Sequence, residues 1–592
     1  MAGWRSLVVL CAASIVSTAS PAVRTAPADT GRITLSIVGT NDLHGRIFTD
    51  QFGRGGLRVL GGFVENLRAA RTADGGGVLL LDAGDTFQGG IESNLSEGRV
   101  IVDAYDVLGY TALAIGNHDF DFGPVDPSDP VEGALAVFQQ TTPSADMRGA
   151  LKAAAARARF PFLAANIVDK ATGAPIAWPN VRPSTIVEIA GIRVGLIGLM
   201  TVGGLRQTLP SHVVGLRTTP LVPTIEREAA VLRQRGAEIV VVVAHEGGWC
   251  GDTSDPRDLR SCDEQGEIFD VARRLAPGTV QAIVAGHTHG TMAHIVNGIG
   301  ITSVPEGGQQ FGRMDLDVDA ATHRLADLRV HPPQNICTLE DPRSHACTAP
   351  GHGVPVRYEG RAVTPSARVD AAMAPELARV QAMRALPLGT IADGPIGRDG
   401  DPESGIGNLF ADALRASIPG ATIALGYGTG RGGLRAGLPE GPLTFGAVYD
   451  VFAFDNRVIR LVVTGAQLAR ALEDQLTRGQ GRVASLSGIR AVVTCDAGTP
   501  RVALSYDDGR AVPAGDSLIV AASSYAAGRT FWTAVEGEPG VEFAEQELLI
   551  RDAVTRWLWH RGHLKAADFF DPARPRWTMP QGPACRAAAS PR

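Results

Sequence analysis

Short runs of apolar, largely β-branched residues recur through the first 330 residues, and longer amphipathic stretches separate them. The apolar runs cover residues 33–38, 78–81, 112–115, 162–166, 193–197, 239–244 and 281–285. Between them, apolar residues recur with helical spacing at residues 61–71 and 223–235. Strands separated by helix-length segments predict an α/β layered domain. Residues 185–198 predict instead a hairpin, with Ala190-Gly191 at its turn.

The pattern changes after residue 331. Residues 332–360 are rich in Pro, His and Cys and lack periodicity, which predicts a connector or stapled loop. Residues 370–384 regain helical spacing and predict an interdomain helix. A second, smaller α/β domain is then expected, with helices at residues 407–417 and 465–476 and strands at residues 422–425, 458–463 and 517–521. We therefore divide the chain into the segments 32–331, 332–388 and 389–577, followed by a polar tail at 578–592.

Length and charge agree with two domains and limit the partners. A chain of 592 residues is too long for one hydrophobic core. A formal net charge of -7 lacks the polycationic field of a protein that binds a nucleic-acid polymer. An anionic substrate must therefore be held by local features such as metal ions or a few arginines.

The first 26 residues predict a signal peptide. Arg5 supplies the positive charge, residues 7–16 form a short apolar core, and residues 17–22 are small. The apolar core is too short to span a bilayer comfortably, and no later segment predicts a transmembrane helix. Cys11 is a poor candidate for lipid attachment because the bulky Leu10 precedes it. We expect a periplasmic or extracellular protein.

The remaining cysteines predict disulfides. They number six, an even count in an exported chain: Cys250, Cys262, Cys337, Cys347, Cys495 and Cys585. The neighbours in sequence are the economical pairs, Cys250 with Cys262 and Cys337 with Cys347, and they leave Cys495 with Cys585. The alternative of a cysteine zinc site requires clustered C-x-x-C spacing, which the chain lacks.

Metal-ligating residue types follow five of the predicted strands, each next to glycine. The segments are Asn41-Asp42-Leu43-His44-Gly45, Gly84-Asp85, Gly116-Asn117-His118-Asp119-Phe120-Asp121, His245-Glu246-Gly247 and Gly286-His287-Thr288-His289-Gly290. One such segment alone is explained as well by a capping aspartate or a turn asparagine. Five of the 13 histidines lie at these strand ends, however, and this is the edge at which α/β sheets bind ligands.

These segments resemble the five motifs of the calcineurin-like metallophosphoesterases. The form GNHDFDFG resembles the 5'-nucleotidase and UDP-sugar hydrolase branch in particular. The resemblance implies a layered α/β metallophosphoesterase sandwich followed by a smaller α/β substrate-binding domain. It also implies a metal-dependent phosphoric ester hydrolase with a dinuclear centre.

Carried over by position, the resemblance assigns a ligand set to each of two divalent ions. One set is Asp42, His44, Asp85 and His289. The other set is Asp85, Asn117, His245 and His287, so that Asp85 bridges the two ions. No thiolate is involved, and Zn, Mn, Fe and Co are all chemically acceptable.

His118 is the motif histidine without a metal. In the resembling family this position contacts the phosphate and helps to stabilise the transition state or the leaving oxygen. Asp121 would orient its imidazole and favour the protonated form. The alternative is that His118 only supports the neighbouring ligands.

The second half of the chain resembles the C-terminal domain of the same family. The match is carried by GNLFADALRAS, GGLRAGLP, VFAFDN and VVTGAQL, mostly within residues 404–472. It implies that Arg435 clamps a phosphate or carboxylate and that two aromatic rings stack on the base. Phe454 matches the first ring, and Tyr525 is the candidate for the second, with Phe531 as reserve.

The substrate segments depart from the family pattern. Gly430 replaces the asparagine that would address the base, and residues 528–531 lack the acidic ribose partner. Arg398 is out of register with an expected arginine. The additional Arg431 and Arg529 favour a more anionic substrate, with Arg431 a candidate contact. None of these changes affects the metal ligands.

The sequence thus predicts hydrolysis of nucleotide phosphate esters, with 5'-nucleoside monophosphates first. Alternatives within the same chemistry are a 2',3'-cyclic phosphodiesterase, a UDP-sugar pyrophosphatase or a phosphatase for another small ester. Thiosulfate-ester hydrolysis is disfavoured because His118 and Asp121 are both present. A non-catalytic surface binding protein is the alternative of a different class. The sequence says nothing about oligomeric state.

Overall fold

The computed structural model of the chain describes most of both predicted domains. The described residues are 31–125, 146–263, 265–349, 351–398, 402–426, 433–452, 456–478, 483–496, 498–523, 535 and 537–580. The predicted signal peptide lies outside them.

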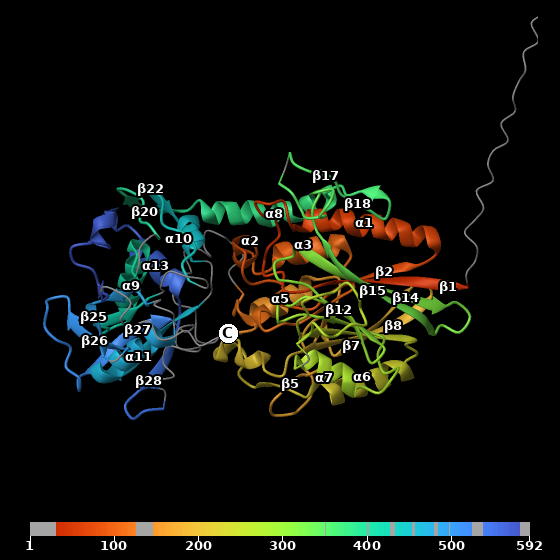
Figure 1. Cartoon of the computed structure of the whole chain (residues 1–592), viewed down its shortest axis with the longest axis horizontal. Coiled ribbons are helices and arrows are strands. Elements are labelled where there is room, and N and C mark those ends of the chain that lie inside the picture. The colour runs from red at the N-terminus through yellow and green to blue at the C-terminus, as the bar shows by residue number, and fades with distance from the viewer. Residues whose placement is uncertain are drawn as a thin grey trace, which may run out of the picture.

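Two sheets packed face to face form the N-terminal domain (Figure 1). The first sheet has the order β15 (Leu325–Asn335), β14 (Gln310–Asp319), β1 (Arg32–Thr40), β2 (Gly77–Asp82), β3 (Ala112–Ala114), β4 (Phe162–Leu163) and β6 (Val181–Arg182). The second sheet has the order β12 (Met292–Val296), β13 (Ile299–Ser303), β11 (Ala282–Ala285), β10 (Ile239–His245), β8 (Ile192–Met200) and β7 (Ser184–Ile189). Strands β1, β2 and β3 run parallel, as do β8, β10 and β11.

Helices cover the outer face of each sheet. Apolar side chains of both sheets, such as Ile37, Leu81, Val243 and Val284, form one core between them. The first sheet carries α1 (Leu57–Asp74), α3 (Arg99–Leu108) and α5 (Gly149–Arg157) on its other face, and the second carries α6 (Leu221–Gln234) and α7 (Glu267–Arg274). Because both faces of each sheet are buried, the strands are continuous apolar runs rather than alternating ones. The predicted layered α/β sandwich is confirmed.

Local predictions differ from the structure in two places. Of the predicted strand at residues 162–166, only β4 (residues 162–163) is formed, because the chain then leaves the sheet and forms the separate β5 (Ile167–Asp169) further on. Residues 332–335, expected in a connector, continue β15 despite Pro332 and Pro333. Strand β15 is at the edge of its sheet, where a proline need not donate to a neighbour. The hairpin is formed by β7 and β8 as predicted, with Ala190 and Gly191 at positive φ.

A second α/β domain follows, in the left half of Figure 1. Its main sheet has the order β24 (Leu486–Ser487), β21 (Ile423–Leu425), β27 (Ser517–Ser523), β23 (Arg457–Thr464) and β28 (Glu542–Leu549). Its helices include α9 (Gly405–Ser417), α10 (Phe445–Val451), α11 (Gly465–Arg478) and α13 (Ile550–Leu558). The side chain of Ser404 caps α9 by accepting a hydrogen bond from the Gly407 amide.

Helix α8 (Ala367–Arg384) runs from one domain to the other (Figure 1). At its end, the Arg384 guanidinium bonds to Asp450 of α10 and lies 3.6 Å from Glu92 of α2 (Ile91–Leu95). Ile91 and Leu95 of α2 pack against the core of the C-terminal domain. The domains are therefore held together by apolar packing as well as by ion pairs.

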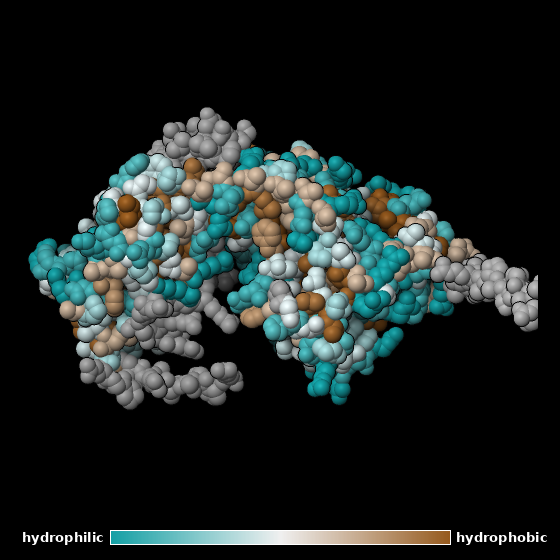
Figure 2. Space-filling view, turned by 90° about the horizontal axis from the view of Figure 1, so that it is seen from above, coloured by the Kyte–Doolittle hydropathy of each residue, from teal (hydrophilic) through white to brown (hydrophobic). Residues whose placement is uncertain are grey.

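Two predicted disulfides are formed, Cys250–Cys262 and Cys337–Cys347. Cys495 is also disulfide-bonded, and Cys585, its expected partner, lies outside the described residues. Hydrophobic side chains form small, separate patches on the face shown in Figure 2, which is usual for a protein surface. None of the helices in the described ranges is long and apolar enough to cross a bilayer.

Candidate metal centre

All seven predicted ligands lie together where five strands end. Asp42 and His44 follow β1, Asp85 follows β2, Asn117 follows β3, His245 ends β10, and His287 and His289 follow β11. Since the parallel strands of each sheet end at the same edge, segments separated by more than 200 residues meet there.

Asp42, His44 and His289 form the first cluster, in which one ligand atom of each lies within 4.8 Å of the others. His44 Nε2 is 3.2 Å from His289 Nε2, which is 3.4 Å from Asp42 Oδ1. Asp42 is fully buried, whereas the His289 side chain is 39% exposed. This cluster therefore opens toward solvent.

Asp85, His245 and His287 form the second cluster, to the same distance limit. His245 Nε2 lies 3.1 Å from Asp85 Oδ2, 3.1 Å from Asn117 Oδ1 and 3.2 Å from His287 Nδ1. His245 and Asp85 are almost completely buried. The second cluster is thus the deeper of the two, and Asn117 adds an oxygen donor to it.

The two clusters adjoin. The backbone amide of His287, in the second cluster, donates to Asp42 Oδ2 of the first at 2.9 Å. A Cβ added to Gly286 would lie 3.0 Å from the same oxygen. Similarly, a Cβ on Gly116 would lie 2.3 Å from Asp85 Oδ1. Glycine at both positions lets backbone approach the ligand carboxylates.

Three of the histidines are oriented by bonds at the ring nitrogen that faces away from the cluster. His44 Nδ1 donates to the Gln88 carbonyl at 3.0 Å, and His245 Nδ1 donates to the Ala83 carbonyl at 2.9 Å. His289 Nδ1 lies 3.3 Å from a carboxylate oxygen of Glu306. Each arrangement leaves Nε2 as the lone-pair donor, which is the usual setting of a metal-ligating histidine.

The ligand segments store backbone strain. Five of the 13 described non-glycine residues with positive φ are predicted ligands: Asp42 (49°), His44 (48°), Asp85 (53°), His287 (72°) and His289 (55°). Such conformations cost free energy and persist only where the surroundings impose them, so they concentrate at functional sites.

Charge and donor chemistry fit divalent cations. Asp42 Oδ1 is buried and accepts no hydrogen bond within the described part of the chain. Burial lowers the pKa of His245, but Asp85 outweighs this effect and the pKa rises to about 9. The two buried carboxylates, Asp42 and Asp85, are therefore stabilised by positive charge beside them. With imidazole and amide donors beside them, the set suits Zn, Mn, Fe or Co.

His118 and Asp121 lie beside the clusters in a short 3-10 helix, η1 (His118–Phe120), and the residue after it. His118 Nδ1 donates to Asp121 Oδ2 at 2.7 Å. The His118 and His44 ring centroids are 5.5 Å apart. Burial lowers the pKa of His118, but Asp121 and then Asp85 outweigh it and raise the pKa to about 10. The bond to Asp121 uses Nδ1, so the Nε2 of His118 is the ring nitrogen that could face a ligand.

Asp119 supports the loops that carry the candidate ligands, although no role for it was predicted from the sequence. Its buried carboxylate accepts hydrogen bonds from the amides of Asp85, Thr86, Phe87 and Gly116. It therefore ties the loop after β2 to the loop after β3. Its position inside the GNHDFDFG segment is the sequence feature that could have indicated this role.

Arg435 is the one predicted substrate contact within the described residues. Burial lowers its pKa, and the positive charge of Arg46 lowers it further, while Glu306 acts in the opposite direction. Glu306 is also the carboxylate beside His289, so Arg435 belongs to the electrostatic surroundings of the first cluster. Arg398 donates to the Arg435 carbonyl at 3.2 Å. Arg431, Phe454, Tyr525 and Phe531 lie outside the described residues.

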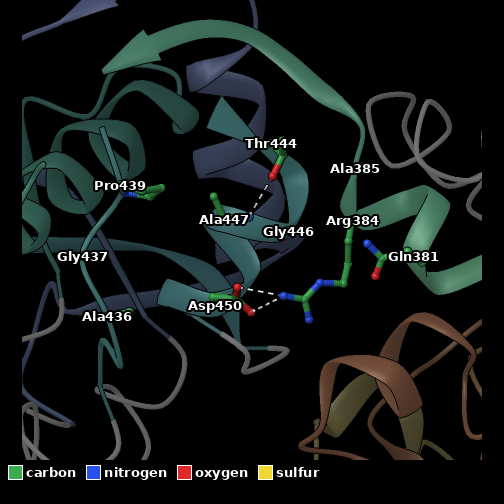
Figure 3. A pocket seen from close by; sticks show the side chains of 10 residues that line it. All are labelled: Gln381, Arg384, Ala385, Ala436, Gly437, Pro439, Thr444, Gly446, Ala447 and Asp450. Carbon is green, nitrogen blue, oxygen red and sulfur yellow. Dashed lines mark hydrogen bonds and ion pairs between the residues drawn. The ribbon is translucent and has the colours of Figure 1, made fainter. Parts of the chain in front are cut away.

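A cavity of about 440 Å³ lies where α8 meets the C-terminal domain (Figure 3). It is lined by residues at the end of α8, by α10, and by Ala436, Gly437 and Pro439, which follow Arg435 in the chain. The Arg384 side chain in it is bound by Asp450. None of the described metal-cluster residues lines this cavity, so it is separate from the metal centre.

Comparison with known proteins agrees with this architecture. The model for the calcineurin-like phosphoesterase domain matches residues 35–291, and the model for the 5'-nucleotidase C-terminal domain matches residues 387–536. Together they cover well over half of the chain, in the order observed here. The chain therefore consists of a calcineurin-like phosphoesterase domain followed by a 5'-nucleotidase C-terminal domain.

Two curated relatives show how far the likeness extends. The 5'-nucleotidase of Vibrio cholerae is 31% identical over 285 residues, which are 47% of this chain and 45% of that protein. Protein UshA of Escherichia coli is 24% identical over 462 residues, 73% of this chain and 74% of that protein. The chain spans less than two thirds of the length of several other curated relatives.

The fold agrees with a solved structure as well. The 5'-nucleotidase precursor of Thermus thermophilus superposes with a TM-score of 0.56 and 22% identity, over 93% of this chain and all of that one. This likeness confirms the predicted fold class, two α/β domains in one chain.

Proposed function

We propose that this protein is an exported phosphoesterase that uses two divalent cations to hydrolyse nucleotide phosphate esters, with nucleoside 5'-monophosphates as the first substrates. One observation carries the proposal: two adjoining carboxylate and imidazole clusters lie at a strand-end edge, next to a histidine that is not needed as a ligand. Asp42, His44 and His289 would hold one cation, and Asn117, His245 and His287 the other, with Asp85 shared between them.

The cations supply the chemistry that no side chain here provides. When bound, a pair of divalent ions polarises the phosphoryl group, offsets its charge and lowers the pKa of water. The side chains of this protein then orient the substrate and move protons. No nucleophilic side chain is required for this route.

His118 is the proposed proton donor at the leaving oxygen. Its Nδ1–H bond to Asp121 leaves Nε2 to face the substrate, and the Asp121 carboxylate outweighs burial, raises the pKa of the ring and so favours its protonated form. Thr208 Oγ1 donates to the other Asp121 oxygen at 3.3 Å, which holds the carboxylate in place. General acid catalysis of this kind contributes roughly 10²- to 10⁴-fold.

Arg435 is the proposed anchor for substrate anions. A guanidinium presents a planar fork that matches two oxygens of a phosphate. Burial lowers the pKa of Arg435 and Arg46 is close enough for its charge to lower it further, so two guanidinium groups would be available to a substrate anion here. Phe454, Tyr525 and Arg431 remain proposed contacts of the nucleoside.

Export is part of the proposal. Residues 1–26 have the composition of a signal peptide. The disulfides Cys250–Cys262 and Cys337–Cys347 are of the kind that persists in oxidising compartments. Both features support a periplasmic or extracellular protein.

A phosphate-release assay tests the function. The protein is stripped with a chelator, reloaded with Zn, Mn, Fe or Co, and assayed with p-nitrophenyl phosphate and a panel of nucleoside mono-, di- and triphosphates, cyclic nucleotides and UDP-sugars. We expect activity to disappear on chelation, to return with metal, and to be highest with 5'-monophosphates. A metal-loaded protein that hydrolyses none of these substrates would contradict the proposal and favour a binding protein.

A further inference from the structure

A segment between β8 and α6 connects the two domains to the catalytic groups. It contains two short 3-10 helices, η2 (Gly204–Arg206) and η3 (Pro210–His212), and we call residues 201–213 the strap. The strap begins beside the metal centre, because the Thr201 amide donates to the His245 carbonyl at 2.8 Å. It ends at His212, which is completely buried.

The strap touches the catalytic residues at three points. Gln207 Nε2 is 3.5 Å from His287 Nε2, and Thr208 Oγ1 donates to Asp121 Oδ1 at 3.3 Å. His212 Nδ1 lies 2.6 Å from the carbonyl oxygen of Phe120, the residue between Asp119 and Asp121. The His212 ring also packs against Gly123, where an added Cβ would be 3.1 Å from His212 Cε1. Gly123 has φ of +77°, so its conformation also favours glycine.

The other side of the same imidazole faces the C-terminal domain. Arg457, the first residue of β23, donates from Nη2 to His212 Nε2 at 2.9 Å. The Arg457 residue is only 6% exposed. A guanidinium is costly to bury without an acceptor, and His212 of the other domain supplies one.

The two contacts determine which nitrogen of the His212 ring carries the proton. A carbonyl oxygen only accepts, so Nδ1 must carry a proton, and a guanidinium only donates, so Nε2 must not. The ring is therefore neutral and makes both bonds at once. It links a side chain of the C-terminal domain to the backbone of the loop that carries His118 and Asp121.

We propose that His212 is a positioning residue that makes the alignment of the His118–Asp121 pair depend on the seating of the C-terminal domain, through Arg457. While Arg457 donates to its Nε2, the His212 imidazole is fixed, and its Nδ1 keeps the Phe120 carbonyl in position. Without Arg457, the loop at residues 117–123 loses a fixed support. The proposal rests on the proposed function for its catalytic consequence, but its structural link is independent of that function.

Arg457→Met tests the link from the side remote from the metals. The matched control is Arg460→Met, an arginine of the same strand, and Arg457→Lys restores a donor. Two quantities are measured in the metal-loaded protein: kcat and KM for p-nitrophenyl phosphate, which has no nucleoside to bind, and hydrogen–deuterium exchange of residues 117–123.

We expect Arg457→Met to lower kcat about tenfold, because the His118–Asp121 pair is then less well aligned, with KM changed by less than about twofold. Amide exchange at residues 117–123 should become faster in the same variant. Arg457→Lys should recover most of both properties, and Arg460→Met should change neither.

Two results would overturn the proposal: unchanged exchange at residues 117–123 in Arg457→Met, or a raised KM with kcat unaffected. An equal effect of Arg460→Met would also overturn it, since the effect would then be a general one of β23. If the wild-type protein hydrolyses no phosphate ester, the proposed function fails, and the exchange comparison still decides whether Arg457 supports the loop.

Discussion

The candidate metal centre and the part of the site around Arg435 are held in place by different contacts. Each metal ligand ends a buried strand or lies within a few residues of one, and hydrogen bonds from its own domain hold it. Arg435 instead belongs to the other domain and reaches the surroundings of His289 only through the way the two domains are seated. Under the proposed function, the chemistry would depend on local contacts, whereas recognition of the substrate would depend on the docking of two separate cores.

This difference explains why the departures from the family pattern fall where they do. Substitutions such as Gly430 and those at residues 528–531 concern substrate segments of the C-terminal domain. We expect the ligand loops to tolerate fewer substitutions, because Asp119 accepts hydrogen bonds from four amides there and two glycines approach the carboxylates closely. We therefore expect a change in the first region to alter which substrate is bound, and a change in the second to alter whether hydrolysis occurs.

The largest effect is expected for Asp85→Asn. The variant removes the shared carboxylate, so hydrolysis of p-nitrophenyl phosphate and of 5'-monophosphates should both fall by more than the roughly ten- to hundredfold expected for a residue that only supports a ligand. Steady-state rates with both substrates measure it, and Asp74→Asn, at the end of α1, is the matched control. Retention of full activity would contradict the assignment of Asp85.

His118→Gln should have the next largest effect. Loss of the proton donor is expected to lower kcat about a hundredfold for both substrates while the bound metal is unchanged. Rates and metal content are measured on the same preparation. A loss of metal in this variant would instead make His118 a structural support of the ligands.

Arg435→Met probes the C-terminal side. We expect kcat/KM for 5'-monophosphates to fall about tenfold, because a phosphate loses a charge-assisted contact, with Arg435→Lys recovering little since it lacks the planar fork. Arg501→Met, an exposed arginine of the same domain, is the control. An unchanged KM and kcat for every substrate in the panel would remove Arg435 from the site.

The same division, between contacts local in the sequence and contacts between distant segments, determines what could be predicted from the sequence. The fold class, and the meeting of the seven candidate ligands at one edge, could be predicted because each depends on residues close together in the chain: an apolar run, then a candidate ligand next to glycine. Asp119, the strap with His212, and the continuation of β15 through Pro332 could not. Each depends on which distant segment lies alongside, and neither periodicity nor spacing carries that information.

The smallest effect on catalysis is expected at Asp315, in the N-terminal domain but on the interior of β14. Burial raises the pKa of Asp315, but bonds from His331 and Arg313 outweigh it and hold the pKa well below its usual value. A carboxylate whose pKa is lower in the folded protein than in the unfolded chain stabilises the fold at pH values above the unfolded-chain pKa of about 4. That stabilisation is lost as the pH falls from there toward the lower pKa of the folded protein.

Asp315→Asn should therefore lower the free energy of unfolding by about 2 kcal/mol at pH 7, and the difference from wild type should narrow below about pH 4. Denaturant unfolding at several pH values measures it. Hydrolysis at 25 °C should be unchanged, because Asp315 contacts Arg313, His331 and Ser36 and no residue of the metal clusters. A pH-independent difference would contradict the charge argument.

The central claim is that side chains from five strand ends bind a pair of cations. Metal content per chain, measured by elemental analysis after reconstitution and removal of loosely bound ions, tests it most directly. The account predicts two divalent ions per wild-type chain and fewer than two in Asp85→Asn. A wild-type protein that binds one ion or none, or an Asp85→Asn variant that still binds both tightly, would contradict it.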